Sequence, residues 1–206
     1  APVPETPPDP SKMEPDQASI DALEAARARA EKSRKQAFDL ESPSYFPDDW
    51  KSAETLFLDA RTAAGERNLA AYRAAAAGYG AAADAYDAVA RKALPLYAEA
   101  RLSEVEAARN RAVAAGVPQL DPDRFAAADA VSERAIGLYG REDYYAAADA
   151  AAEAGARYEA LKIGADAVAV KSEIDRRNFA RFDSGNYALA GTKLGQAMAS
   201  DRKSVV

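Results

Sequence analysis

One pattern, an aromatic residue followed by alanines three and ten positions later, occurs five times in this chain of 206 residues. The five copies are Trp50/Ala53/Ala60, Tyr72/Ala75/Ala82, Phe125/Ala128/Ala135, Tyr144/Ala147/Ala154 and Tyr187/Ala190/Ala197. These offsets place the three residues of each copy on one face of an α-helix. A ring followed by small side chains on the same face lets a second helix pack very close. The pattern therefore predicts an array of closely packed helices.

The amino-acid composition favours helices and disfavours sheets. Alanine, which has the highest helix propensity, accounts for 54 of the 206 residues. Valine, isoleucine and threonine, which favour strands, are sparse. We therefore expect an all-α fold made of TPR-like helical hairpins joined by long shared helices, as an elongated bundle or a short solenoid.

Two residue types are absent, and their absence excludes several kinds of chemistry. Without cysteine the chain has no disulfide, thiolate nucleophile or thiolate metal ligand, and without histidine it lacks the commonest general base. We expect no enzymatic activity, no metal and no cofactor. The net charge of −6 is ordinary for a water-soluble domain and does not indicate binding to nucleic acid. The absence of cysteine is compatible with both the periplasm and the cytoplasm.

Residues 1–17 differ in composition from the rest of the chain. They contain six of the 11 prolines and show no helical periodicity, so we expect a disordered, proline-rich linker. Such a segment is either a plain flexible end or a tether. No apolar run reaches the roughly 18 residues that a membrane span needs, so membrane anchoring is expected only through sequence preceding Ala1. The start at Ala1 is typical of a processed or trimmed terminus.

Helix boundaries can be predicted from capping residues, glycines and prolines. We expect Ser19 to cap the first helix, Gly65 to stop the second, Asp121 to cap the fourth, and Pro95 to kink or briefly break the third. The expected helices span residues 19–41, 47–64, 68–115, 121–140, 142–182 and 186–201.

The chain also matches itself. LEAARARA at 23–30 agrees with VEAARNRA at 105–112 at six of eight positions, and FPDDW at 46–50 corresponds to DPDRF at 121–125. Each predicted unit has a leading helix, a short helix that starts with an aromatic residue, and a long helix that becomes the next leading helix. The units are expected at about 18–97 and 98–170, with a partial unit at 171–206. Stacking of such units would bury faces that one hairpin cannot bury alone.

The spacing in two of these stretches resembles the second helix of tetratricopeptide (TPR) repeats. They are Tyr144-x2-Ala147-x6-Ala154 and the segment from Gly185 to Ala197; Ala135 and Leu138 would fall at first-helix positions. The family's Trp, its Leu-Gly pair and its closing proline are missing, and the spacing is not the regular 34. The resemblance implies stacked helical hairpins that bind other molecules, similar to modules of bacterial envelope proteins.

Exposed aromatic and basic side chains are the candidate binding residues. Arg27 and Lys35 belong to a basic cluster on the first helix, and Phe179 stands beside Arg177 and Arg181. Anionic partners or a solvated face both account for the basic residues. Tyr145, which follows the first tyrosine of a pair, completes the candidate site.

Other notable residues are interpreted as structural. Asp48 and Asp49 suit a helix N-terminus. Gly78 and Gly80 indicate close helix packing. The stripe of Tyr72, Tyr79 and Tyr86 suits the core, with an aromatic-lined groove as the alternative.

These features predict a non-enzymatic protein-binding or spacer module of a bacterial envelope protein, in the periplasm or cell envelope. Its partner would be another protein or a cell-wall component. The alternative is a carrier of a small apolar or lipid-like ligand held between long helices.

Overall fold

The computed structural model describes the backbone of residues 9–203 and the side chains of residues 9–196. Every regular element in this part of the chain is helical, which confirms the all-α prediction. None of these helices is long and apolar enough to cross a membrane. The elements are η1 (Pro10–Lys12), α1 (Gln17–Asp39), α2 (Ser42–Tyr45), α3 (Pro47–Ala63), η2 (Ala64–Glu66), α4 (Leu69–Ala114), α5 (Val117–Leu120), α6 (Pro122–Tyr139), α7 (Tyr144–Arg176), η3 (Phe179–Phe182) and α8 (Ser184–Lys203).

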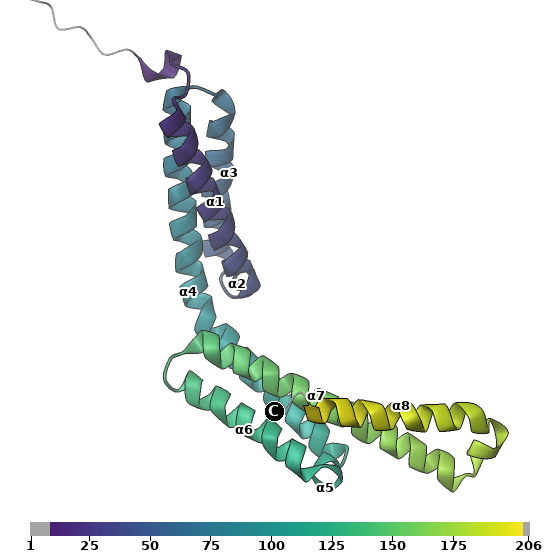
Figure 1. Ribbon diagram of the computed structural model, residues 1–206. Coiled ribbons are helices and arrows are strands. Elements are labelled where there is room, and N and C mark those ends of the chain that lie inside the picture. Colours follow the sequence, from purple (N-terminus) through teal and green to yellow (C-terminus); the bar gives the residue numbers. More distant parts are fainter. Residues whose placement is uncertain (1–8, 204–206) are drawn as a thin grey trace, which may run out of the picture. The chain divides into compact units, whose positions relative to one another are not determined.

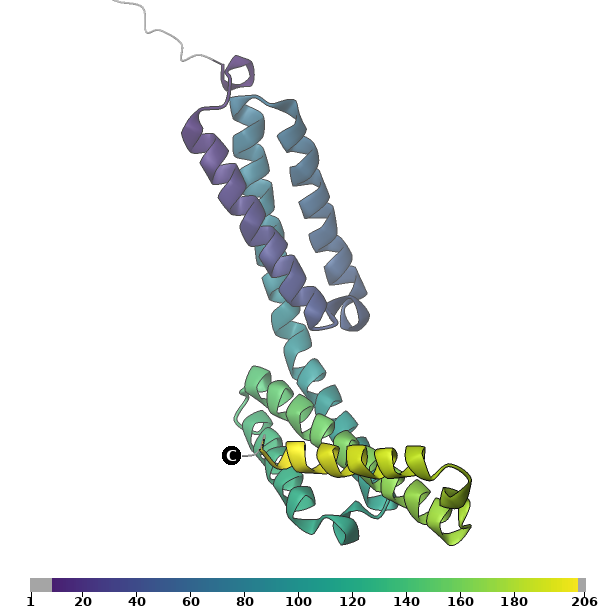
Figure 2. The ribbon, with the colours of Figure 1, turned by 45° about the vertical axis from the view of Figure 1, so that its right-hand side comes forward.

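The chain divides into two compact units, residues 1–97 and residues 98–206, and the division falls inside α4. In the first unit, α1, α3 and the N-terminal part of α4 lie side by side (Figures 1 and 2). Their shared core contains Ala37 from α1, Ala53 from α3, and Ala82 and Tyr86 from α4. A neighbouring cluster joins Ala30, Ala60, Tyr79 and Ala83. Alanines at the contacts let the three helices approach closely.

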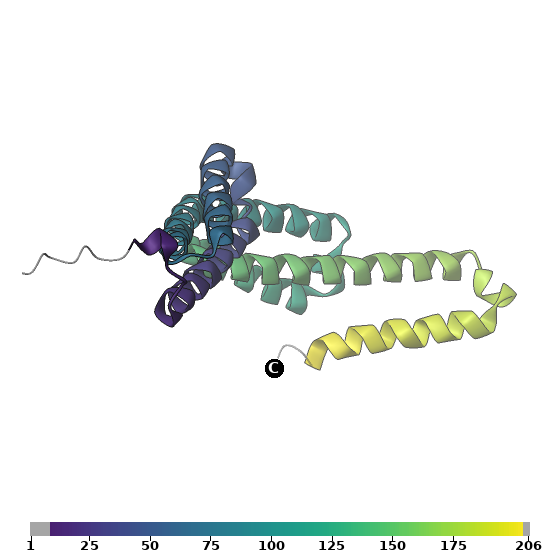
Figure 3. The same ribbon diagram turned by 90° about the horizontal axis from the view of Figure 1, so that it is seen from above.

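The second unit repeats this arrangement with other helices. Its core joins Val105 and Ala112 from α4, Phe125 from α6, and Ala154 and Tyr158 from α7. The C-terminal part of α7 then continues beyond this core and packs against α8, which runs back along it after η3 (Figure 3). The hairpin of α7 and α8 has no third helix among the described residues.

The five copies of the aromatic–alanine pattern are buried to different extents. In the first four copies, both alanines are at most 3 % exposed. In the fifth copy Ala190 is exposed and Tyr187 is half-buried, while the side chain of Ala197 lies outside the described residues. The pattern therefore marks a helical face that is suited to burial, but the fifth face is left uncovered.

The stripe of tyrosines on α4 belongs mainly to the core. Tyr79 and Tyr86 are 2 % and 0 % exposed, and Tyr72 is half-buried. The interpretation of these residues as core is confirmed for Tyr79 and Tyr86.

Several predicted boundaries were wrong, each for a local reason. The cap of α1 is Asp16 rather than Ser19, because the Asp16 carboxylate accepts a hydrogen bond from the Ser19 backbone N–H. The left-handed residue after α3 is Arg67 rather than Gly65. The assigned helix α4 runs through Pro95 without a break. By contrast, Asp121 caps α6 as predicted, accepting from the Arg124 N–H.

The largest error concerns the end of α7. The predicted helix reached Phe182, but α7 ends at Arg176 because Asn178 adopts a left-handed conformation with φ of 55°. The next four residues form the separate 3₁₀-helix η3. The short helices α2 and α5, each of four residues, were not predicted either.

The proline-rich segment is described only in part. Residues 1–8, which carry much of the predicted linker, lie outside the described residues. In the remainder, η1 forms a short turn, and the Leu69 N–H donates a hydrogen bond of 2.9 Å to the Met13 carbonyl. This bond attaches the end of the segment to the start of α4.

Candidate functional site

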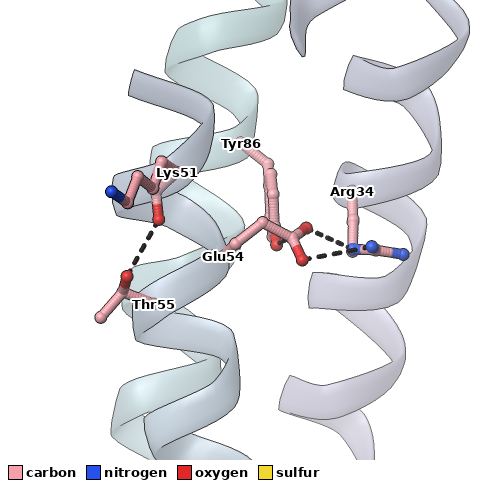
Figure 4. Close-up of polar contacts among 5 residues, drawn as sticks. All are labelled: Arg34, Lys51, Glu54, Thr55 and Tyr86. Atoms are coloured by element: carbon pink, nitrogen blue, oxygen red, sulfur yellow. Dashed lines mark hydrogen bonds and ion pairs between the residues drawn. The ribbon is translucent and has the colours of Figure 1, made fainter. Parts of the chain in front are cut away.

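A carboxylate in the first unit joins three helices. Arg34 on α1 donates to both oxygens of Glu54 on α3, at 2.5 and 3.2 Å. The hydroxyl of Tyr86 on α4 donates to the same carboxylate at 2.6 Å (Figure 4). The guanidinium also lies 5.7 Å from the ring centre of Trp50. Figure 4 also shows that the Thr55 hydroxyl bonds the Lys51 carbonyl within α3, a local helical contact that lies apart from this clasp.

The second unit contains the same clasp. Arg109 on α4 donates to both oxygens of Asp129 on α6, at 2.7 and 3.2 Å, and Tyr158 on α7 donates to Asp129 as well. The Arg109 guanidinium lies 5.2 Å from the ring centre of Phe125. In both units the base stands 16 residues before the aromatic residue, and the acid stands four residues after it.

The electrostatics of the clasps indicate a structural role. Burial alone would raise the pKa of Glu54, but the hydrogen bonds from Arg34 and Tyr86 outweigh it and lower the pKa below its ordinary value. The Arg109 guanidinium likewise lowers the pKa of Asp129. Burial, together with the bond to Glu54, raises the pKa of Tyr86. These groups do not change charge near neutral pH, as an acid–base catalyst would.

The α7–α8 hairpin repeats the beginning of this arrangement. Lys171 stands 16 residues before Tyr187, its ammonium lies 5.2 Å from the Tyr187 ring centre, and it donates to the Tyr187 hydroxyl at 2.7 Å. Asn178 adopts the left-handed conformation seven residues after Lys171, as Glu41 does after Arg34. At the position of the acid, however, the hairpin has Gly191.

An apolar groove of about 270 Å³ lies between α7 and α8. Its lining residues are Ala167, Val170, Lys171 and Ile174 from α7, and Tyr187, Ala190, Gly191 and Leu194 from α8. The lining is open to solvent, since Val170 is 61 % exposed and Ala190 is also exposed. In the two complete units the corresponding grooves are filled by a third helix.

Aromatic and basic side chains gather at the tip of the same hairpin. The Arg177 guanidinium lies 5.9 Å from the ring centre of Phe179, and that of Arg181 lies 4.8 Å from the ring centre of Phe182. The two rings are 6.3 Å apart and are 50 % and 72 % exposed. We call these four residues the tip cluster. Exposed rings backed by guanidinium groups are typical of protein-binding surfaces.

The predicted site residues do not form one site. Arg177, Phe179 and Arg181 come together in the tip cluster, whereas Tyr145, 47 % exposed, lies at the opposite end of α7. Arg27 and Lys35 belong to the first unit. They form ion pairs with acids one turn further along α1, at Glu31 and Asp39.

The groove residues were missed by the sequence analysis. The recurring interval of 16 residues from a base to an aromatic residue could have identified them, because it selects Lys171 and Tyr187 alongside the two complete clasps. A second groove, of about 440 Å³, lies between α4 and α6 and has acidic residues including Glu99, Glu106 and Glu133 in its lining. No group of three or more potential metal ligands occurs among the described residues.

Comparisons of this chain with protein families, with curated proteins and with solved structures found no match.

Proposed function

We propose that this chain is a non-enzymatic, TPR-like helical module that binds another protein through the α7–α8 hairpin. The observation that carries the proposal is the exposure of Ala190. The corresponding alanines, Ala53 and Ala128, are both 0 % exposed in the complete units. A face with the same pattern is therefore open on the hairpin, and the tip cluster adds two exposed rings beside it.

The placement in a bacterial cell envelope, or in the periplasm, is part of the proposal. It rests on the resemblance of the helical hairpins to modules of envelope proteins and on the proline-rich segment that precedes them.

The two clasps support a non-enzymatic role. Glu54 and Asp129 stay ionised because arginines bind them, and buried tyrosines donate to both. Their function is to join three helices in each unit. A carrier of a small apolar ligand, the alternative, requires an enclosed cavity, whereas the α7–α8 groove is lined by exposed residues.

Site-specific photo-crosslinking in the cells that make the protein tests the proposal. A photoreactive phenylalanine analogue replaces Phe182 in one variant and Leu58 in the control, which lies on α3 and is 43 % exposed. We expect a discrete crosslinked product from position 182 and none from position 58. No product at 182, or the same products at both positions, would refute binding at the hairpin. The first of these outcomes would favour a spacer.

A further inference from the structure

The groove between α7 and α8 has the form of a unit whose third helix is missing. Building on the proposed binding role, we propose that it binds one helix of a partner protein. This partner helix is alanine-rich and carries a central tyrosine, as the third helices of the two complete units do.

The third helices of the complete units show what such a groove accepts. In the first unit α4 inserts Tyr86 between α1 and α3, and the ring lies 5.2 Å from that of Trp50. In the second unit α7 inserts Tyr158 between α4 and α6, 5.6 Å from the ring of Phe125. Both tyrosines are 0 % exposed. Two independent stretches of this chain thus solve the same packing problem in the same way.

The two inserted helices share a sequence pattern around the tyrosine. An alanine stands four residues before it, at Ala82 and Ala154, and another stands seven residues after it, at Ala93 and Ala165. All four alanines are at most 4 % exposed. Small residues allow close approach, so the partner helix needs this pattern of alanines on its contact face.

The third hairpin presents matching but uncovered residues. Val170 occupies the position of Ser33 and Ala108, which are 6 % and 3 % exposed, yet Val170 is 61 % exposed. Ile174, at the position of the fully buried Ala37 and Ala112, is half-buried. Because these larger side chains replace small ones, the open groove offers additional apolar area to the partner helix.

A second copy of this chain cannot supply the helix without losing its own core. Its two helices with the required pattern hold Tyr86 and Tyr158, and both are fully buried in their own units. The occupant must therefore come from a different protein. Gly191 replaces the acid of the clasps, so the incoming tyrosine finds no carboxylate at that position. A Cβ at Gly191 would meet no atom within 4 Å, which leaves space for a side chain.

The test uses the full chain and a labelled synthetic peptide with the sequence of residues 144–165. Fluorescence anisotropy measures peptide binding to the unaltered protein and to two variants. Ala190→Arg places a charge in the groove, and Leu189→Arg places the same charge on an exposed neighbour that does not line it. We expect saturable binding that Ala190→Arg weakens by about tenfold or more, while Leu189→Arg changes it by less than about twofold.

A gain of affinity provides a second, independent arm. Gly191→Asp restores the acid of the clasps, and Gly195→Asp adds the same charge one turn further along, where a Cβ also meets no atom within 4 Å. We expect Gly191→Asp to strengthen binding by about fivefold and Gly195→Asp to leave it unchanged. A peptide with phenylalanine at the position of Tyr158 should lose this gain.

Three results would overturn the inference. They are the absence of saturable binding, equal effects of the two arginine variants, and self-association through the groove that excludes the peptide. Equal effects would mean that the peptide exchanges with the chain's own α7 rather than entering the groove. If crosslinking at position 182 succeeds while the peptide fails, the module binds a partner of different chemistry, and only this inference falls.

Discussion

The buried hydroxyl of Tyr86 donates a hydrogen bond of 2.6 Å to Glu54, a carboxylate that Arg34 binds from a third helix. One side chain of α3 thereby fixes both α1 and α4. Alanine-rich faces pack closely but have little shape to define how two helices align along their lengths. The clasp supplies a directional contact that does so, and Asp129 has the same place in the second unit.

Removing the Tyr86 hydroxyl should destabilise the protein. Tyr86→Phe keeps the buried ring but deletes one of the donors to a partly buried carboxylate, so we expect a loss of about 1–2 kcal/mol in the free energy of unfolding. Tyr72→Phe, on the same helix, is the control, because that hydroxyl has no hydrogen bond recorded to another described residue. Urea denaturation measures both. An unchanged midpoint for Tyr86→Phe would show that the clasp adds nothing to stability.

Acid should weaken the fold through the same carboxylates. The pKa values of Glu54 and Asp129 are lowered in the folded protein, so the folded state favours their ionised forms. Their contribution is present above the ordinary values of about 4 and is lost as the pH falls through the lowered ones. We expect the melting temperature to decline between about pH 5 and pH 3.

Glu54→Gln tests the assignment of this pH dependence. The variant should be less stable than the unaltered protein at neutral pH and should lose less of its remaining stability in acid. A variant whose melting temperature falls with pH as steeply as that of the unaltered protein would assign the dependence to other acids.

Two glycines on α4, two residues apart, should respond in opposite ways to alanine. A Cβ at Gly78 would lie 2.9 Å from the Cβ of Ala60, whereas one at Gly80 would meet no atom within 4 Å. Gly78→Ala should therefore cost about 1–3 kcal/mol by overpacking. Gly80→Ala should stabilise the helix by up to about 1 kcal/mol, because alanine has the higher helix propensity. Thermal melts of both variants decide the question, and equal shifts would contradict the close approach of α3 and α4.

Two phenylalanines separate a core ring from a surface ring. Phe125 is 7 % exposed and packs on Tyr158, whereas Phe182 in the tip cluster is 72 % exposed. Phe125→Ala should lower the free energy of unfolding by about 3–5 kcal/mol. Phe182→Ala should change it by less than about 0.5 kcal/mol. A large loss of stability for Phe182→Ala would mean that the tip cluster holds the hairpin together.

The sequence analysis predicted the helical class because alanine content and the aromatic–alanine spacing act locally. It placed the start of α3 at Pro47 and the cap of α6 at Asp121, where the capping residues themselves carry the signal. It failed at Asn178, since a left-handed conformation at a non-glycine residue has little local signature. It also failed at Asp16, where two capping residues compete and a tertiary bond at Met13 fixes the approach of the chain.

Predicting the candidate site from sequence was limited by long-range packing. The fifth aromatic–alanine copy looks like the other four, and nothing near Ala190 records that no third helix covers it. The match between residues 23–30 and 105–112 was also misleading, because it implies an offset of 82 residues. The contacts of Arg34 and Arg109 give an offset of 75, so the leading helices correspond two turns away from the best sequence match.

The helix α4 closes the first unit with its beginning and opens the second with its end. One consequence concerns how a chain of this kind lengthens. Each further pair of helices completes one more unit, because the last helix of every unit already serves as the first helix of the next. A gene could therefore grow by duplicating about 75 bases' worth of codons on each helix-pair step, that is, the interval that separates Arg34 from Arg109. At every stage of such growth the newest hairpin carries an unfilled groove.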